Sequence, residues 1–176
     1  DWLSGAMQAN TPWSGYYKVE DGIWGFAHTT QFTKPGWNYI DNACGYLDAG
    51  GSYVTLQDNG TADNRKSNPD FSIIVETGGA SDTQTMNFTL NGMSNHEIAV
   101  WKTEQGNTFQ KVDTITPQNG KFSYSVDPNC IYSFTTTTGQ QKGEAETAIP
   151  ENKEFPMDYE DDFDSYQSGE RPTYFS

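Results

Sequence analysis

Apolar and polar residues alternate with a period of two over the middle of the chain. This pattern predicts β-strands, because successive side chains of a strand point to opposite faces of a sheet. Asn91-Gly92 and Asn119-Gly120 separate some of the strands, and both residues of an Asn-Gly pair tolerate the positive φ of a tight hairpin. Seven short antiparallel strands predict a β-sandwich. They are expected at 52–58, 71–77, 83–90, 97–103, 109–115, 121–126 and 130–138.

One helix is predicted before the strands, over residues 23–33. Ile23, Trp24, Ala27 and Phe32 fall roughly on one helical stripe. Lys34-Pro35-Gly36 should end the helix, since a residue before proline is pushed out of the α region and glycine turns the chain. The fold class is therefore mostly β: an antiparallel sandwich with one N-terminal helix and an extended acidic C-terminal segment.

The two ends of the chain differ from the middle. Residues 1–22 read as a loop in which glycines and aromatic residues are mixed, so this loop either plugs a core or lines a pocket. Residues 139–176 carry ten acidic and three basic residues, with Pro150 and Pro156 among them. This composition predicts an extended linker, followed by a new element that begins near Tyr159.

The charge of the chain narrows the classes of partner. Its 24 acidic and 10 basic residues give a net charge of −14. This argues against nucleic acids and anionic membrane surfaces, because both require basic patches. We find neither a transmembrane run of about 18 apolar residues nor a signal peptide. The chain begins DWLSGAMQAN, without an initiator Met, so we interpret it as a mature or excised piece.

Cysteines and glycosylation sequons bear on the compartment. Cys44 and Cys130 have no metal-binding spacing; they either form a disulfide, as in an oxidising compartment, or act as two small buried hydrophobic residues. Asn59 and Asn87 each begin an Asn-x-Thr sequon and are candidate glycosylation sites. Together these residues favour an extracellular location.

Few residues suggest catalysis. His28 and His96 are the two histidines, and no G-x-S-x-G motif accompanies them. We interpret His28 as a hydrogen-bonded packing residue and His96 as solvated. No pair of carboxylates stands out as a glycosidase acid and base. Asp162 and Asp164 would suit Ca²⁺ as oxygen ligands, the alternative being a solvated acidic stretch.

Several stretches resemble glycoside hydrolase family 59, the galactosylceramidase-like enzymes. They occur in the order and rough spacing of that family and cover nearly the whole chain. The stretch at 27–37 is the most specific of them. They are TPWSGYY at 11–17, AHTTQFTKPGW at 27–37, GYLDAGGSYVTL at 45–56, FTTTTG at 134–139 and DYEDDFD at 158–164.

The resemblance implies a division into four parts. Residues 1–36 would close a (β/α)₈ barrel, and 37–140 would form the β-sandwich. Residues 141–157 would be a linker, and 158–176 would begin a lectin-like jelly roll. The family's two catalytic glutamates belong to barrel strands outside this chain, since a barrel takes about 250 residues. No residue here is assigned a catalytic role, and the chain alone should be inactive.

The resemblance also implies ligands and partners. Trp13 and Tyr16 would line the sugar pocket, on a loop after the last barrel strand. Asp162-Phe163-Asp164 matches a stretch that contributes to a calcium site, and no other cofactor is implied. The substrate would be a β-galactoside or a glycolipid, bound through the barrel, and the remaining polypeptide or partner subunits would cover the sandwich. Secretion or a lysosome-like compartment is expected.

One other class of function stays open at this stage. The chain would then be a non-catalytic module, either carbohydrate-binding or structural, that consists of the sandwich without a barrel.

Overall fold

A computed structural model describes residues 5–59, 68–172 and 174. The chain divides into two compact units. One combines Asp1–Ile23 with Gly143–Ser176, and the other is Trp24–Lys142. The larger unit holds the sandwich.

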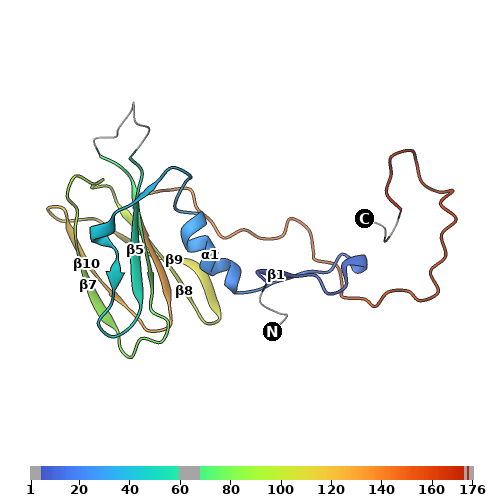
Figure 1. The fold of residues 1–176 in the computed structure, drawn as a ribbon, viewed down its shortest axis with the longest axis horizontal. Helices are drawn as coiled ribbons and strands as arrows, with labels where there is room; N and C mark the ends of the chain where they lie inside the picture. Colours follow the sequence, from blue (N-terminus) through green and yellow to red (C-terminus); the bar gives the residue numbers. More distant parts are fainter. Residues whose placement is uncertain (1–4, 60–67, 173, 175–176) are drawn as a thin grey trace. The chain divides into compact units, whose positions relative to one another are not determined.

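Two antiparallel sheets build the larger unit (Figure 1). The strand order of the large sheet is β3-β5-β6-β11-β8-β9, with β4 also paired to β5. Its strands are β3 (Asn38–Tyr39), β4 (Gly45–Tyr46), β5 (Ser52–Gln57), β6 (Phe71–Glu76), β8 (Ile98–Glu104), β9 (Asn107–Ile115) and β11 (Ile131–Thr135). The small sheet pairs β7 (Gln84–Thr89) with β10 (Lys121–Val126). All seven predicted strands are confirmed, as is the fold class.

The sandwich core lies between the two sheets. Alternate residues of the central strands face it, including Val75 from β6, Val100 from β8 and Phe134 from β11, none of which has measurable exposure. Met86 and Phe122 close it from the small sheet. Burying each such side chain contributes about 1.5–3 kcal/mol, so this alternating pattern is what holds the sheets together.

The opposite face of the large sheet is covered by α1 (Gly22–Thr30) (Figure 1). Ala27 and Phe32 pack there with Trp101 of β8 and Phe109 of β9. Strand β8 is consequently buried on both faces, with Ile98 and Val100 on the sandwich side and Trp101 on the helix side.

The helix is shorter than the predicted range of 23–33. It ends at Thr30, and the backbone N–H of Phe32 then donates to the carbonyl of Thr29, the tighter spacing typical of a helix end. This tightened turn accompanies the insertion of the Phe32 ring, which is 1% exposed, into the aromatic cluster. Within the described residues, no helix has the length and apolarity to cross a membrane.

The smaller unit has little regular structure. Strand β1 (Met7–Gln8) pairs with β2 (Lys18–Val19), and the 3₁₀ helix η1 (Pro12–Ser14) lies between them. A second 3₁₀ helix, η2 (Asp41–Ala43), belongs to the larger unit. Residues 143–172 form neither helix nor strand. The assignment of 158–176 to the first strand of a lectin-like domain stays a prediction.

Candidate functional site

The loop predicted to line a sugar pocket is built around η1. Trp13 lies in η1, and Gly15 ends it in the left-handed conformation at φ 72°. The indole N–H of Trp13 donates to the carbonyl of Lys153 at 2.7 Å, and its ring meets Phe155 edge-on at 5.7 Å. Tyr16 is half-buried, and its backbone N–H donates to Ser14 Oγ. The loop is thus held in a defined shape by residues far along the chain.

The acidic segment is organised around Asp161 rather than around the two predicted calcium ligands. The hydroxyls of Tyr159 and Tyr166 both donate to its carboxylate, and these bonds hold the pKa of Asp161 below its usual value. Asp162 Oδ1 accepts from the backbone N–H of Asp164 at 3.1 Å. Among the described residues, no three Asp, Glu, His or Cys side chains gather closely enough to hold a metal ion. The assignment of Asp162 and Asp164 as calcium ligands stays a prediction.

His28 joins α1 to the large sheet. Its Nδ1 lies 2.8 Å from Ser133 Oγ on β11, and its Nε2 lies 2.8 Å from Thr103 Oγ1 on β8. Ser133 Oγ donates its own proton to the carbonyl of His28, so Nδ1 must be the donor in the first contact. In the neutral tautomer that carries its proton on Nδ1, Nε2 accepts from the Thr103 hydroxyl.

The electrostatics agree with this assignment. Burial lowers the pKa of His28 from 6.5 to about 4, since a charge in this setting would lose its hydration without gaining a carboxylate partner. Both ring nitrogens are occupied, which leaves no lone pair for a substrate or a metal. The interpretation of His28 as a hydrogen-bonded packing residue is confirmed, and His96 is exposed.

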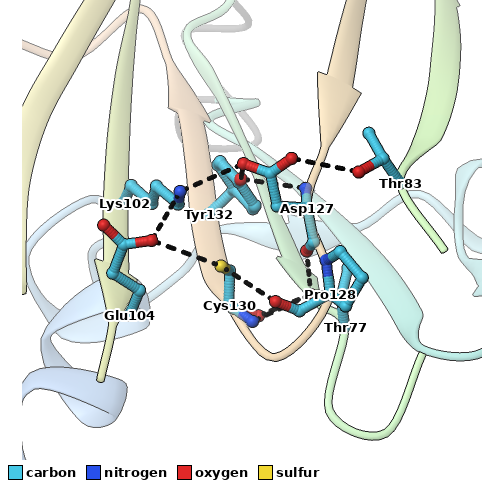
Figure 2. Close-up of polar contacts among 8 residues, drawn as sticks. All are labelled: Thr77, Thr83, Lys102, Glu104, Asp127, Pro128, Cys130 and Tyr132. Carbon is cyan, nitrogen blue, oxygen red and sulfur yellow. Dashed lines mark hydrogen bonds and ion pairs between the residues drawn. The ribbon is translucent and has the colours of Figure 1, made fainter. Parts of the chain in front are cut away.

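A second polar cluster fastens the far end of the sandwich (Figure 2). Lys102 of β8 bridges Glu104 at 2.7 Å and Asp127 at 3.1 Å. Burial lowers the pKa of Lys102, but hydrogen bonds to the two carboxylates outweigh burial and raise the pKa overall. Tyr132 donates to Asp127, and Thr83 does the same from the other side. These mutually satisfied charges link strand β8 to the turn before β11, which indicates a structural fastening.

Cys130 lies in this cluster, and the predicted disulfide to Cys44 is not formed. Both cysteines are free. Cys44 Sγ accepts from the backbone N–H of Thr55, whereas Cys130 is hydrogen-bonded to Thr77. Thr55 pairs with Ile73 of β6, and Thr77 follows Ile73 by four residues along the chain. At the rise of a β-strand, the positions next to Cys44 and Cys130 are therefore about 13 Å apart along β6. A disulfide requires Cα atoms within about 7 Å, so the sheet itself keeps the two thiols apart.

Burial also raises the pKa of the Cys130 thiol, which donates to the carbonyl of Pro128 (Figure 2). A protonated, buried thiol is a poor nucleophile. The alternative interpretation, in which the cysteines fill space as small hydrophobic residues, fits Cys130, which is 4% exposed.

Of the two sequons, Asn87 is the better described. It lies exposed on β7, where its side-chain oxygen accepts from Ser123 Oγ. Asn59 is described, but the two residues that complete its sequon lie outside the described residues. Glycosylation of either residue stays a prediction.

Comparison with known proteins places this architecture. The sequence profile of glycosyl hydrolase family 59 matches residues 2–31. The chain is 36% identical to galactocerebrosidase of Mus musculus over 183 residues, and 35% identical to that of Homo sapiens over 182 residues. These alignments cover 91% and 90% of this chain, and 25% of each relative. The chain is thus similar to one stretch of the glycoside hydrolase family 59 enzymes.

The chain spans about a quarter of the length of the curated relatives it matches. A solved structure supports the fold: a family 30 endoxylanase from Clostridium papyrosolvens gives a TM-score of 0.50 at 18% identity. That match covers 66% of this chain and 28% of the endoxylanase. At this identity the likeness concerns the fold alone.

The structure also contains polar contacts that the sequence did not predict. The partners of His28 are Ser133 and Thr103, and the partners of Lys102 are Glu104 and Asp127. The available signal was the alternation in IYSFT, which places Ser133 and Thr135 on the face opposite Tyr132 and Phe134. A hydroxyl-bearing strand face beside a helix that carries a histidine suggests such a network.

Proposed function

We propose that the chain is a portion of a galactocerebrosidase-type glycoside hydrolase, a retaining enzyme that cleaves β-galactosides. This portion would brace the catalytic barrel and would not supply the catalytic glutamates. The observation that carries the proposal is the identity of about 35% to galactocerebrosidases over some 90% of the chain. The polar clusters around His28 and Lys102 support a bracing role, because their side chains are hydrogen-bonded to one another within the sandwich.

The proposal includes the division of the chain. Residues 1–36 would complete the barrel, 37–140 form the sandwich, 141–157 connect, and 158–176 begin a lectin-like domain. The remaining polypeptide would be the principal partner, and the protein would act in a secretory or lysosome-like compartment. Calcium would require oxygen ligands beyond Asp162 and Asp164. Calcium titration of the 176-residue chain should therefore leave its melting temperature unchanged, and a rise would show that this chain holds the ion alone.

The function is tested by comparing this chain with the longer protein that contains it. With a chromogenic β-galactoside, the longer protein should show turnover and the 176-residue chain should show none. Loss of turnover on removal of this stretch, with the barrel still folded, would support bracing. Turnover by the chain alone, abolished by changing one of its own carboxylates, would overturn the proposal.

Trp13 and Tyr16 are the proposed contacts to substrate. In the longer enzyme, Trp13→Ala should raise KM for the galactoside by about tenfold, since an aromatic ring packs against the apolar face of a sugar. Trp37→Ala is the matched control, because Trp37 is also half-buried but follows the helix. An unchanged KM in Trp13→Ala would remove this residue from the site.

A further inference from the structure

The sandwich is open along one side, where a cleft of about 840 Å³ separates β5 and the segment before it from β7. The cleft forms because the two-stranded sheet is narrower than the large sheet, which leaves the inward face of β5 partly uncovered. Phe71 and Ile73 of β6 form its floor. Its volume lies within the range of roughly 300–1,000 Å³ that is typical of small-molecule sites.

The walls of the cleft combine neutral amides with aromatic rings. Asn42, Gln57 and Asn91 line it, and their side chains make no hydrogen bond to the protein within the described part of the chain. Tyr46 is 89% exposed at the rim, and Tyr53 lies further in. Three unpaired amides and an exposed ring in one concave surface are groups available to a ligand.

One wall of the cleft is held in place by the protein. Gln84 of β7 accepts from the backbone N–H of Ala49 at 2.7 Å and donates to the carbonyl of Gly50 at 2.9 Å. Gly51 has a φ of 104°, and a Cβ there would meet the carbonyl oxygen of Glu76 at 2.3 Å. The loop is therefore fixed before any ligand arrives, which lowers the ordering cost of binding.

The charge of the lining selects the kind of ligand. Among the described residues, the cleft is lined by the carboxylate of Asp48 and by no Lys, Arg or His. Within this described lining, phosphates, sulfates and uronic acids would meet no cationic side chain and one repelling carboxylate. A neutral sugar offers hydroxyls that pair with amides in both directions and an apolar face that packs on an aromatic ring. We propose that this cleft binds a neutral oligosaccharide.

The proposal is independent of catalysis by the longer protein, so the 176-residue chain serves for the test. The chain is made in a bacterial host, which leaves Asn87 at the cleft without a glycan. Titration with lactose and with cellobiose is followed by NMR and calorimetry. At least one sugar should shift the side-chain amide signals of Asn42, Gln57 and Asn91, whereas digalacturonic acid should not.

Variants separate the cleft from other surfaces. Tyr46→Ala and Gln57→Ala should each weaken sugar binding by about fivefold or more, as expected for loss of one ring contact or one hydrogen-bonding group. Tyr39→Ala is the matched control, since Tyr39 is 60% exposed on β3 but does not line the cleft. Trp13→Ala should also leave this binding unchanged. If Gln57→Ala fails to fold, Asn91→Ala replaces it.

Three results would overturn the proposal. The first is that neither neutral sugar shifts these amides, and the second is that Tyr39→Ala weakens binding as much as Tyr46→Ala does. The third is that the cleft binds an extended peptide through the open edge of β7 and no sugar. That edge is available because β7 pairs only with β10 among the described strands.

Discussion

At the scale of single residues, the neutral state of His28 is the most consequential feature. The folded protein keeps this imidazole uncharged down to a pKa of about 4, whereas the unfolded chain titrates near 6.5. Between these values the unfolded chain binds a proton that the folded chain does not. The stabilising contribution is therefore complete above pH 6.5 and is lost as the pH falls toward 4.

We expect the free energy of unfolding to fall by about 3 kcal/mol from this source between pH 6.5 and 4. His28→Gln should be less stable than the wild type at pH 7 but should show a flatter pH dependence across this window. His96→Gln is the matched control, because His96 is exposed and, within the described part of the chain, makes no contact with the His28 network. Urea denaturation at several pH values measures this, and an equally steep profile in His28→Gln would contradict it.

At the scale of elements, β9 contains a bulge that positions the aromatic cluster. Thr108 and Phe109 lie opposite the single residue Thr103, and the backbone N–H of Phe109 donates to the Thr103 hydroxyl. Phe109 adopts a φ of 51°, a conformation that a bulky residue rarely takes. Phe109 is 1% exposed, and the centroid of its ring lies 4.7 Å from that of Trp101 and 5.4 Å from that of His28. Packing therefore sustains a strained backbone.

Phe109→Ala should destabilise the protein by about 3–5 kcal/mol through loss of packing. Phe109→Gly should cost no more than Phe109→Ala, because glycine adopts positive φ without strain and so offsets its greater flexibility. At Thr114, which is exposed, pairs in register with Ala99 and has negative φ, glycine should be the more harmful of the two by about 0.5–1 kcal/mol. Chemical denaturation compares the four variants; the usual order at both positions would show that Phe109 is unstrained.

The elements also show how far the sequence predicts the fold. The strand at 71–77 was predictable because it is a short apolar run, and the strand at 97–103 because its apolar side chains alternate between two faces. Strands β3 and β4 were not, since two residues cannot display a period. The bulge at Phe109 carries no glycine to announce it. The hydrogen-bond partners of His28 are 75 and 105 residues away, so only tertiary structure brings them together.

At the scale of the whole molecule, Lys142 is the last of the described residues after β11 that is held by contacts to the sandwich, and the residues that follow it are exposed. Lys142 donates to the carbonyl and hydroxyl of Thr108 and lies 4.5 Å from the Trp24 ring. Beyond it, residues 143–158 are exposed and contain no helix or strand. The sequence predicted this exposed linker from its charge and prolines, but not the attachment of Lys142, which precedes it.

Trypsin should therefore cleave after Lys153, whose side chain is 71% exposed, before it cleaves after Lys142. The reason is that cleavage requires local opening. Lys142 must release both Thr108 and the Trp24 ring, whereas at Lys153 only the bond from the Trp13 indole to the Lys153 carbonyl must open. Mass spectrometry of a time course gives the order of cuts. Lys142→Arg is a control that keeps the cut site and the charge, and the reverse order of cleavage would contradict the attachment.

The candidate site was less predictable than the fold. Trp13 and Tyr16 were singled out by an aromatic-rich loop and a family resemblance, but the contact of Trp13 with Lys153 spans 140 residues. The cleft beside β5 was not predicted, because amides such as Gln57 and Asn91 are spread along the chain and acquire a common setting only through strand pairing.

Strand β11 has one further consequence. Most strands keep their register because a slip by one residue would expose their apolar face to water. Both faces of β11 are buried, so exposure of apolar side chains to water does not separate the correct register from a slipped one. Polar contacts fix the register instead. A slip by one residue would place Phe134 against the imidazole of His28 and Ser133 in the apolar core of the sandwich. The hydroxyls of Ser133 and Thr103, together with the imidazole of His28, thus fix the register of β11 in the sheet.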